Sequence, residues 1–181
     1  MVTQRLPLGV PAFLGLVAAA TAGLLGALLG LATPLSAQNR IAAPGWEGFA
    51  TRDNENHFER CVLYNKSIEA LTISPYDMLG ITRAANGQVG LMVFFKPSAL
   101  KRGSNIPVTL RIDQQRIAAL PGQALSDFHV IAGPMGAEAV AALRQASAVE
   151  ASAEGKTVRF EVADVGAVLD ALDECVKANA R

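Results

Sequence analysis

Apolar side chains recur at helical spacing near the end of the chain, between residues 164 and 178. They form one stripe, and most charged residues of the segment lie away from it; the stripe consists of Val165, Val168, Leu169, Leu172 and Val176. Such a stripe predicts an amphipathic helix that packs on a core. Asp164 is expected to be its N-cap, because a carboxylate there can accept the unpaired amide protons of the first turn. Cys175 lies one turn beyond Leu172 and therefore falls on the flank of the stripe.

Strands are predicted over most of the preceding 110 or so residues, from alternation of apolar and polar positions and from short apolar runs. The predicted strands are residues 58–64, 78–83, 88–95, 108–112, 116–120, 128–131, 149–151 and 157–162. In residues 88–95 both alternating sets are apolar, so this strand is expected to be central and covered on both faces. Residues 68–73 fit either a short strand or a turn of helix, and residues 137–146 predict a weakly amphipathic helix.

Two dipeptides predict tight connections between these strands. Asn86-Gly87 is the strongest hairpin signal of the chain, because a primed two-residue turn needs positive φ at both positions. Glu154-Gly155 is expected to join residues 149–151 to residues 157–162. The order of elements predicts an α+β fold: a β-rich antiparallel sheet or small sandwich, with a short helix, a β-hairpin and a C-terminal amphipathic helix packed on it.

The first 37 residues have the pattern of an export signal. Arg5 is the only charge before Arg40, residues 6–32 are rich in Leu, Ala and Gly, and Ser36-Ala37 follows the helix-breaking Pro34. We expect a signal peptide cleaved after Ala37. The apolar run is also long enough to span a bilayer, so a retained N-terminal membrane anchor is the alternative. In both cases the body of the protein is exported.

The remaining chain divides into a polar entry segment, residues 38–56, and a single globular domain, residues 57–181. Trp46 and Phe49 are the only large apolar side chains of the entry segment, and we expect them to pack it onto the domain. A ligand-stacking role for Trp46 is the alternative.

The charge balance excludes some partners. The chain has 16 basic and 16 acidic residues, and removal of residues 1–37 leaves 15 basic ones. A nearly neutral domain gives no electrostatic reason to bind nucleic acid or an anionic membrane surface. A membrane contact is expected only through a retained N-terminal segment. The partner is expected to be an envelope protein or a small ligand.

Cys61 and Cys175 are the only cysteines. An even count in an exported protein predicts a disulfide, because that compartment keeps thiols oxidised. The bond would close a loop of about 115 residues, which on chain-entropy grounds stabilises the fold by roughly 4 to 5 kcal/mol. Two unrelated buried cysteines are the alternative.

No catalytic, cofactor-binding or metal-binding residues are assigned from the sequence. The Cys and His residues lack the spacing of metal ligands, and no nucleophile elbow or phosphate-binding glycine loop is present. The oxygen-rich residues 53–57 lack the glycine and terminal glutamate of a calcium loop, which favours a solvated turn. His129 lies within a predicted strand, facing outward, or else acts as the base of a hydrolase next to a Ser or Asp.

Several short segments form a recognisable series after the export signal. They are the early strand with Cys61, Arg111-Ile112-Asp113 at the end of a strand, the helix at residues 139–144, the hairpin, the Phe-x-Val of residues 160–162, and Val-Gly-Ala-Val-Leu-Asp-Ala-Leu at residues 165–172. Together they resemble the small periplasmic proteins of alphaproteobacteria related to the invasion-associated locus B family. The resemblance implies a β-rich domain completed by the hairpin and last helix, with no established catalytic residues to transfer. This chain departs from that pattern by having only two cysteines, one of them in the last helix.

The sequence therefore predicts an exported, periplasmic or secreted, non-enzymatic accessory or binding protein of the bacterial envelope. The alternatives are an exported hydrolase that uses His129, and a domain tethered to the inner membrane and facing the periplasm. An enzyme should place His129 within hydrogen-bond reach of a Ser or Asp in a concave site, whereas a binding module should show an exposed apolar patch or a free sheet edge.

Overall fold

The computed structural model describes residues 40–74, 76–96 and 100–180, without the side chains of Leu71, Thr72 and Arg116. The predicted signal peptide or anchor lies outside these residues. Among the helices of the described part, none combines the length and the apolar character needed to cross a bilayer.

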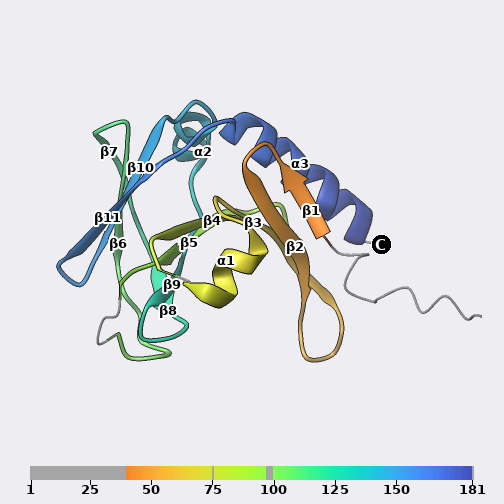
Figure 1. Cartoon of the computed structure of the whole chain (residues 1–181), viewed down its shortest axis with the longest axis horizontal. Helices are drawn as coiled ribbons and strands as arrows, with labels where there is room; N and C mark the ends of the chain where they lie inside the picture. Colours follow the sequence, from red (N-terminus) through yellow and green to blue (C-terminus); the bar gives the residue numbers. More distant parts are fainter. Residues whose placement is uncertain (1–39, 75, 97–99, 181) are drawn as a thin grey trace, which may run out of the picture. The chain divides into compact units, whose positions relative to one another are not determined.

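Two antiparallel sheets form the framework (Figure 1). The large sheet has seven strands in the order β1-β2-β3-β4-β5-β9-β8; they are β1 (Arg40–Ala43), β2 (Trp46–Arg52), β3 (Phe58–Tyr64), β4 (Met78–Ala84), β5 (Val89–Phe94), β8 (Gly122–Ala124) and β9 (His129–Ala132). The small sheet has the order β11-β10-β6-β7; its strands are β6 (Val108–Ile112), β7 (Gln115–Leu120), β10 (Ala148–Ala153) and β11 (Lys156–Glu161). The helices are α1 (Ile68–Ile73), α2 (Ala137–Arg144) and α3 (Val165–Asn179). The predicted β-rich α+β class is confirmed.

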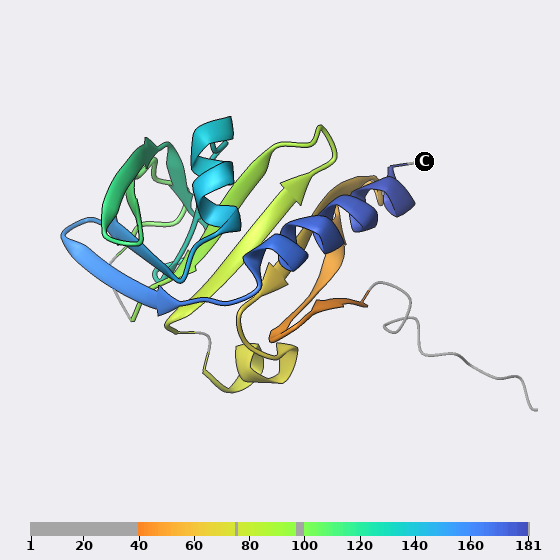
Figure 2. The ribbon, with the colours of Figure 1, turned by 90° about the horizontal axis from the view of Figure 1, so that it is seen from above.

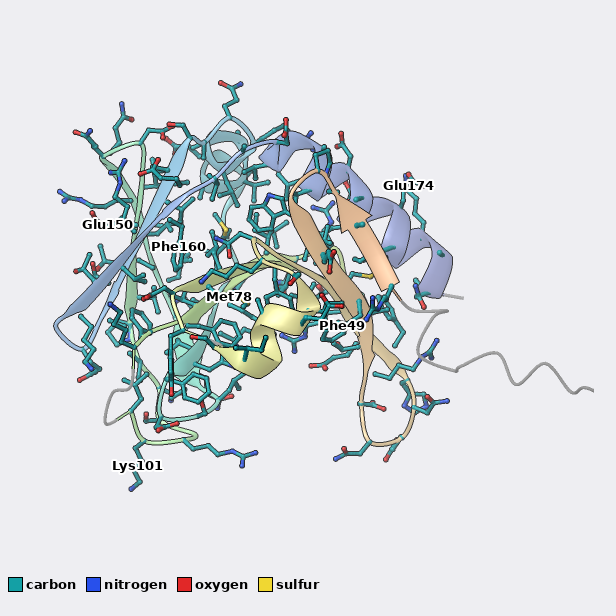
Figure 3. The ribbon with its side chains drawn as sticks, viewed as in Figure 1. Phe49, Met78, Lys101, Glu150, Phe160 and Glu174 are labelled. Atoms are coloured by element: carbon teal, nitrogen blue, oxygen red, sulfur yellow. A yellow bond between two sulfur atoms is a disulfide. The ribbon has the colours of Figure 1, made fainter. Side chains whose placement is uncertain are left out.

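The main core lies between the large sheet, the small sheet and the two longer helices. Seen from above, α3 runs across the strands at the β1 side of the large sheet, and it contacts β1, β2, β3 and β4 (Figure 2). Leu63, Leu91 and Leu110 are fully buried in this core. Phe160 and Met78 lie inside the molecule, whereas Lys101 and Glu174 extend from its surface (Figure 3). All six residues of β5 are buried, as predicted for a central strand.

The segment expected as a polar entry is instead built into the large sheet. β1 and β2 form a hairpin through Pro44-Gly45, where Gly45 has a φ of 75°. The physical reason is the pattern of β2, in which Trp46, Gly48 and Ala50 alternate as buried positions. Trp46 is 3% exposed and packs in the main core, as expected from its role as an anchor.

The C-terminal helix has the predicted buried stripe, which includes Val168, Leu172 and Cys175. Asp164 occupies the N-cap position, but the predicted capping bond is wrong. Its backbone is left-handed, with a φ of 55°, and its side chain makes no capping hydrogen bond. By contrast, residues 68–73, which fitted a strand or a helix, form α1 with Ser67 as N-cap, whose hydroxyl accepts from the amide of Ala70.

The hairpin at Asn86-Gly87 is confirmed, but its turn type is not the predicted one. Only Gly87 has positive φ, at 83°. The amide of Ala84 donates to Gln88 and the amide of Gly87 donates back to Ala84, so the loop has three residues and a left-handed glycine at its end. Primed turns with two positive φ values occur at Asp113-Gln114 and Glu154-Gly155 instead.

Candidate functional site

A disulfide joins the large sheet to the last helix. Cys61 of β3 and Cys175 of α3 are bonded, with Cα atoms 6.3 Å apart and a sequence separation of 114. Both residues are buried, at 0% and 5% exposure. The predicted pairing is confirmed, and the described part of the chain has no free cysteine.

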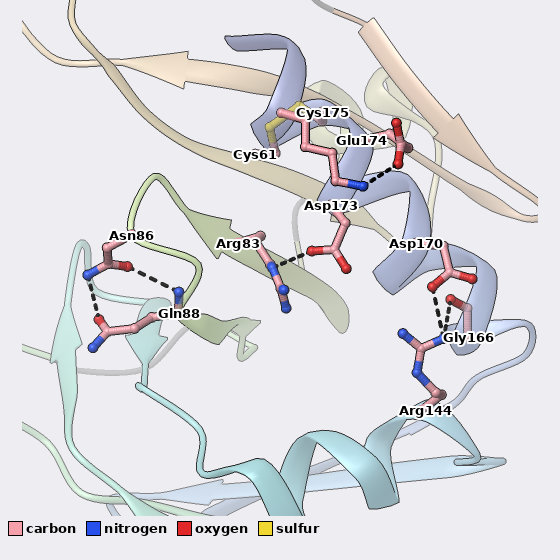
Figure 4. A network of polar contacts seen from close by, with 11 residues as sticks. Cys61, Arg83, Asn86, Gln88, Arg144, Gly166, Asp170, Asp173, Glu174 and Cys175 are labelled. Atoms are coloured by element: carbon pink, nitrogen blue, oxygen red, sulfur yellow. Dashed lines mark hydrogen bonds and ion pairs between the residues drawn. A yellow bond between two sulfur atoms is a disulfide. The ribbon is translucent and has the colours of Figure 1, made fainter. Parts of the chain in front are cut away.

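Ion pairs extend this connection along α3 (Figure 4). Arg83 of β4 places Nε 2.5 Å from Oδ1 of Asp173. Arg144, at the end of α2, donates to Oδ1 of Asp170 over 2.9 Å and to the carbonyl oxygen of Gly166 over 3.3 Å. The helix is therefore held to β3 by a covalent bond and to β4 and α2 by charge-assisted hydrogen bonds.

A separate concave site of about 370 Å³ lies across β3, β4, β5, β9 and β8. We call it the outer-face site and define it by Arg60, Thr82, Gln88, Asn105, Gln123 and Ile131. In β3 and β4 its residues alternate with Cys61 and Ile81 of the main core, so they point to the opposite face of the sheet. Ile131 also contributes to a second apolar cluster on that face, which contains Val62, Tyr64, Met78, Met92 and Phe94.

The floor of the outer-face site is kept open by a glycine. A Cβ atom on Gly90 would lie 2.9 Å from the carbonyl oxygen of Ala132 and 3.1 Å from the hydroxyl of Thr82. Only glycine fits this position without a shift, and it leaves backbone as the floor of the site.

The rim of the outer-face site is polar. Gln88, Asn105 and Gln123 are exposed carboxamides, and Thr82 is a buried hydroxyl beneath them, 4% exposed. Asn105 and Gln123 face each other across an antiparallel bridge, so their side chains project on the same side. Arg60 is the one charged residue among the described residues that line the site. Its guanidinium also pairs with the neighbouring Glu59.

His129 packs against an aromatic ring in the described part of the chain. Its ring stacks on Phe94, with centroids 4.0 Å apart, and its buried Nε2 atom has no hydrogen-bond partner. Burial lowers the pKa of His129 to about 4. The expected contact of a hydrolase, from this ring to a Ser or Asp, is absent from the described residues, and His129 does not line the outer-face site.

The oxygen-rich loop at residues 53–57 is a hydrogen-bonded turn. Oδ1 of Asp53 accepts from the amides of Glu55 and His57, over 2.9 and 2.8 Å. The His57 amide is the main reason why the pKa of this carboxyl lies below its usual value. Among the described residues, no group of three His, Cys, Asp or Glu side chains could hold a metal ion.

Sequence reasoning missed the outer-face site. Arg60 and Gln123 come from distant strands, and neither stands out in its own segment. One usable signal was present: a glycine inside a strand often marks a close approach of backbone or ligand, and Gly90 lies within the strongly apolar β5.

The sheets, the last helix and the disulfide define a β-rich α+β domain with the kind of cross-link that an oxidising, extracytoplasmic compartment maintains. No family model and no curated protein matches the chain. Among solved structures it is similar to the crystal structure of invasion associated protein b from Bartonella henselae, with 14% sequence identity and a TM-score of 0.46. The match covers 78% of this chain and 99% of that one. The resemblance found in the sequence is to the family of the same name.

Proposed function

We propose that the protein is an exported, non-enzymatic binding or accessory protein of the bacterial envelope, periplasmic or secreted after removal of residues 1–37. The observation that carries the proposal is the Cys61–Cys175 bond, because a buried disulfide between a strand and the last helix needs an oxidising compartment to form and persist. The leader-like composition of the first 37 residues independently supports export.

Binding rather than catalysis is supported by the chemistry of the concave site. The outer-face site combines hydrogen-bonding groups with an open glycine floor, which suits recognition of a small ligand or a short segment of a partner. A hydrolase would need a base oriented toward a nucleophile. His129 instead stacks on an aromatic ring and keeps Nε2 buried without a partner among the described residues.

The test of export is an intact mass of the protein from its native cells, with thiols alkylated before any reduction. We expect a mass that begins at Gln38 and carries no alkyl group. A full-length mass recovered with membranes would favour the tethered alternative, and two alkylated thiols would contradict the proposal. A second aliquot, alkylated after reduction, is the control and should gain two alkyl groups.

The proposal that the protein is not an enzyme is tested with a panel of ester and amide substrates. We expect no hydrolysis above buffer by the wild-type protein. Hydrolysis that disappears in the variant His129→Gln, with folding unchanged by circular dichroism, would establish the hydrolase alternative instead. The variant His57→Gln is the matched control, because it changes the other histidine of the chain, in an exposed loop.

A further inference from the structure

The outer-face site has a chemical bias that points to one class of ligand. Its described lining includes one cation, Arg60, and no acidic side chain. A guanidinium offers five N–H donors in a planar fork, and Glu59 engages one end of this fork. The side chain of Arg60 is 23% exposed. A ligand that enters the site therefore meets a partly desolvated positive group, which favours a carboxylate.

The rest of the rim matches peptide groups. Each of the three carboxamides both donates and accepts hydrogen bonds, as a peptide group does. Asn105 and Gln123 stand side by side across their bridge, and Gln88 belongs to the hairpin at the other wall. Its Oε1 atom accepts from Nδ2 of Asn86 over 3.1 Å, which holds the carboxamide in place (Figure 4).

The lining of the site disfavours a sugar, and its glycine floor favours a slender ligand. No aromatic side chain is among the described residues that line the site, whereas sugar rings are commonly bound by stacking on an aromatic platform. The glycine backbone at Gly90 lets a main chain approach closely, and Ile131 adds apolar contact. The volume of about 370 Å³ lies at the small end of ligand sites.

We propose that the outer-face site binds the C-terminal end of a short peptide, whose free carboxylate pairs with Arg60 while Gln88, Asn105 and Gln123 hydrogen-bond to its last peptide groups. The inference rests on the proposed function of a binding protein and adds the ligand class. In this arrangement Arg60 recognises the free carboxylate of the peptide, and the three carboxamides recognise its backbone. The site therefore selects peptides that have a free C-terminus and small side chains.

The probe is tri-alanine, added to the ¹⁵N-labelled mature domain and followed by NMR. The side-chain NH₂ signals of Gln88, Asn105 and Gln123 report directly on the rim. We expect saturable shifts of these signals with tri-alanine and at least about tenfold weaker binding of its C-terminal amide, since a charge-assisted hydrogen bond is removed. This comparison uses the wild-type protein and needs no variant. Equal affinity of the two peptides overturns the proposal.

The variant Arg60→Gln identifies the partner of the carboxylate. The variant should weaken the affinity for tri-alanine by about tenfold or more. It should leave the already weak affinity for the C-terminal amide of tri-alanine nearly unchanged, as expected if Arg60 and the carboxylate interact directly. Equal weakening of both peptides would overturn the pairing. Arg159→Gln, an exposed arginine of β11, is the matched control and should bind as wild type. Melting curves of both variants verify folding.

Two further probes test whether the site prefers a peptide to a simple carboxylate or a sugar. Acetate alone should bind at least about tenfold more weakly than tri-alanine, because it lacks the peptide groups; equal binding would reduce the site to a carboxylate site and overturn the proposal. N-acetylglucosamine should leave the rim signals unmoved, and saturable shifts with it would also contradict the inference. Absence of tri-alanine binding up to about 10 mM overturns the ligand assignment. This result would leave the proposed export of a disulfide-bonded domain unaffected, because the intact mass tests export independently of any ligand.

Discussion

The indole N–H of Trp46 donates to the carbonyl oxygen of Ala163 over 3.1 Å, across 117 positions of sequence. This bond connects the start of β2 to the residue before Asp164, where the chain turns with a left-handed φ of 55° into α3. The helix therefore starts without a side-chain cap of its own and is positioned by the large sheet. With the disulfide at Cys175, α3 is connected to that sheet near both of its ends.

Replacing Trp46 with Phe should destabilise the domain by about 1 to 3 kcal/mol, because the bond to Ala163 is lost and the smaller ring leaves unfilled space. Urea denaturation followed by far-UV circular dichroism measures this, since Trp46 is the only tryptophan and the variant loses that fluorescence signal. The control is Ile73→Ser, at a position that is 84% exposed, which should stay within about 0.5 kcal/mol of wild type. An unchanged midpoint for Trp46→Phe would show that the contact is not needed for stability.

The double variant Cys61→Ser, Cys175→Ser should lose roughly 4 to 5 kcal/mol of stability, because the bond closes a loop of 114 positions in the unfolded chain. The oxidised wild type, the reduced wild type and the double variant are compared in the same denaturation series. Reduction should bring the wild type close to the variant and have no effect on the variant itself. If reduction leaves the melting temperature of the wild type unchanged, the bond is not a stabilising one.

Leu172→Ala should lower the free energy of unfolding by roughly 2 to 5 kcal/mol, since the Leu172 side chain of α3 is fully buried in the main core. The matched control, Ala178→Ser, alters an exposed position near the end of the same helix, where little change is expected. Both are measured by chemical denaturation with the disulfide intact. A cost near zero for Leu172→Ala would remove this residue from the core.

Local periodicity was sufficient to predict most of the framework. The stripe of α3, the alternation of β6 and the doubly apolar β5 each depend on residues near one another in sequence, and the disulfide followed from an even cysteine count in an exported chain. β1 and β2 were missed because their polar and small residues mask the alternation of Trp46 and Ala50. The cap at Asp164 failed because tertiary contacts, including that of Trp46, set the entry into the helix.

The outer-face site could not be predicted in the same way. The strand order β4-β5-β9-β8 places Thr82, Gly90 and Gln123 near each other only after the chain has left the large sheet to form β6 and β7 and has returned. No spacing in the sequence encodes that return. Three carboxamides and an arginine are common surface residues, and they gain a shared role only through the register of these strands.

His129 gives the domain a pH dependence of defined sign. In the unfolded chain the imidazole has a pKa of about 6.5, whereas burial lowers the folded value to about 4. Between these values the unfolded chain binds a proton that the folded chain does not, so stability should fall as the pH drops from about 6.5 to about 4 and should lose no more from this group below that. At about 1.4 kcal/mol per pKa unit, the difference between these two values limits the loss to about 3.5 kcal/mol.

The variant His129→Phe should remove this component, because a phenyl ring keeps the stacking on Phe94 and has no proton to bind. Urea denaturation of wild type and variant at pH 4.5 and 7.5 provides the comparison, and the variant should show the smaller difference between the two pH values. The carboxyls of Asp53 and Asp113 have lowered pKa values, and their contributions, lost at more acidic pH, are shared by both proteins. His57→Gln, in the exposed loop, should keep the dependence of the wild type. An equal fall in stability for His129→Phe and wild type would mean that His129 is protonated as readily in the folded state as in the unfolded one.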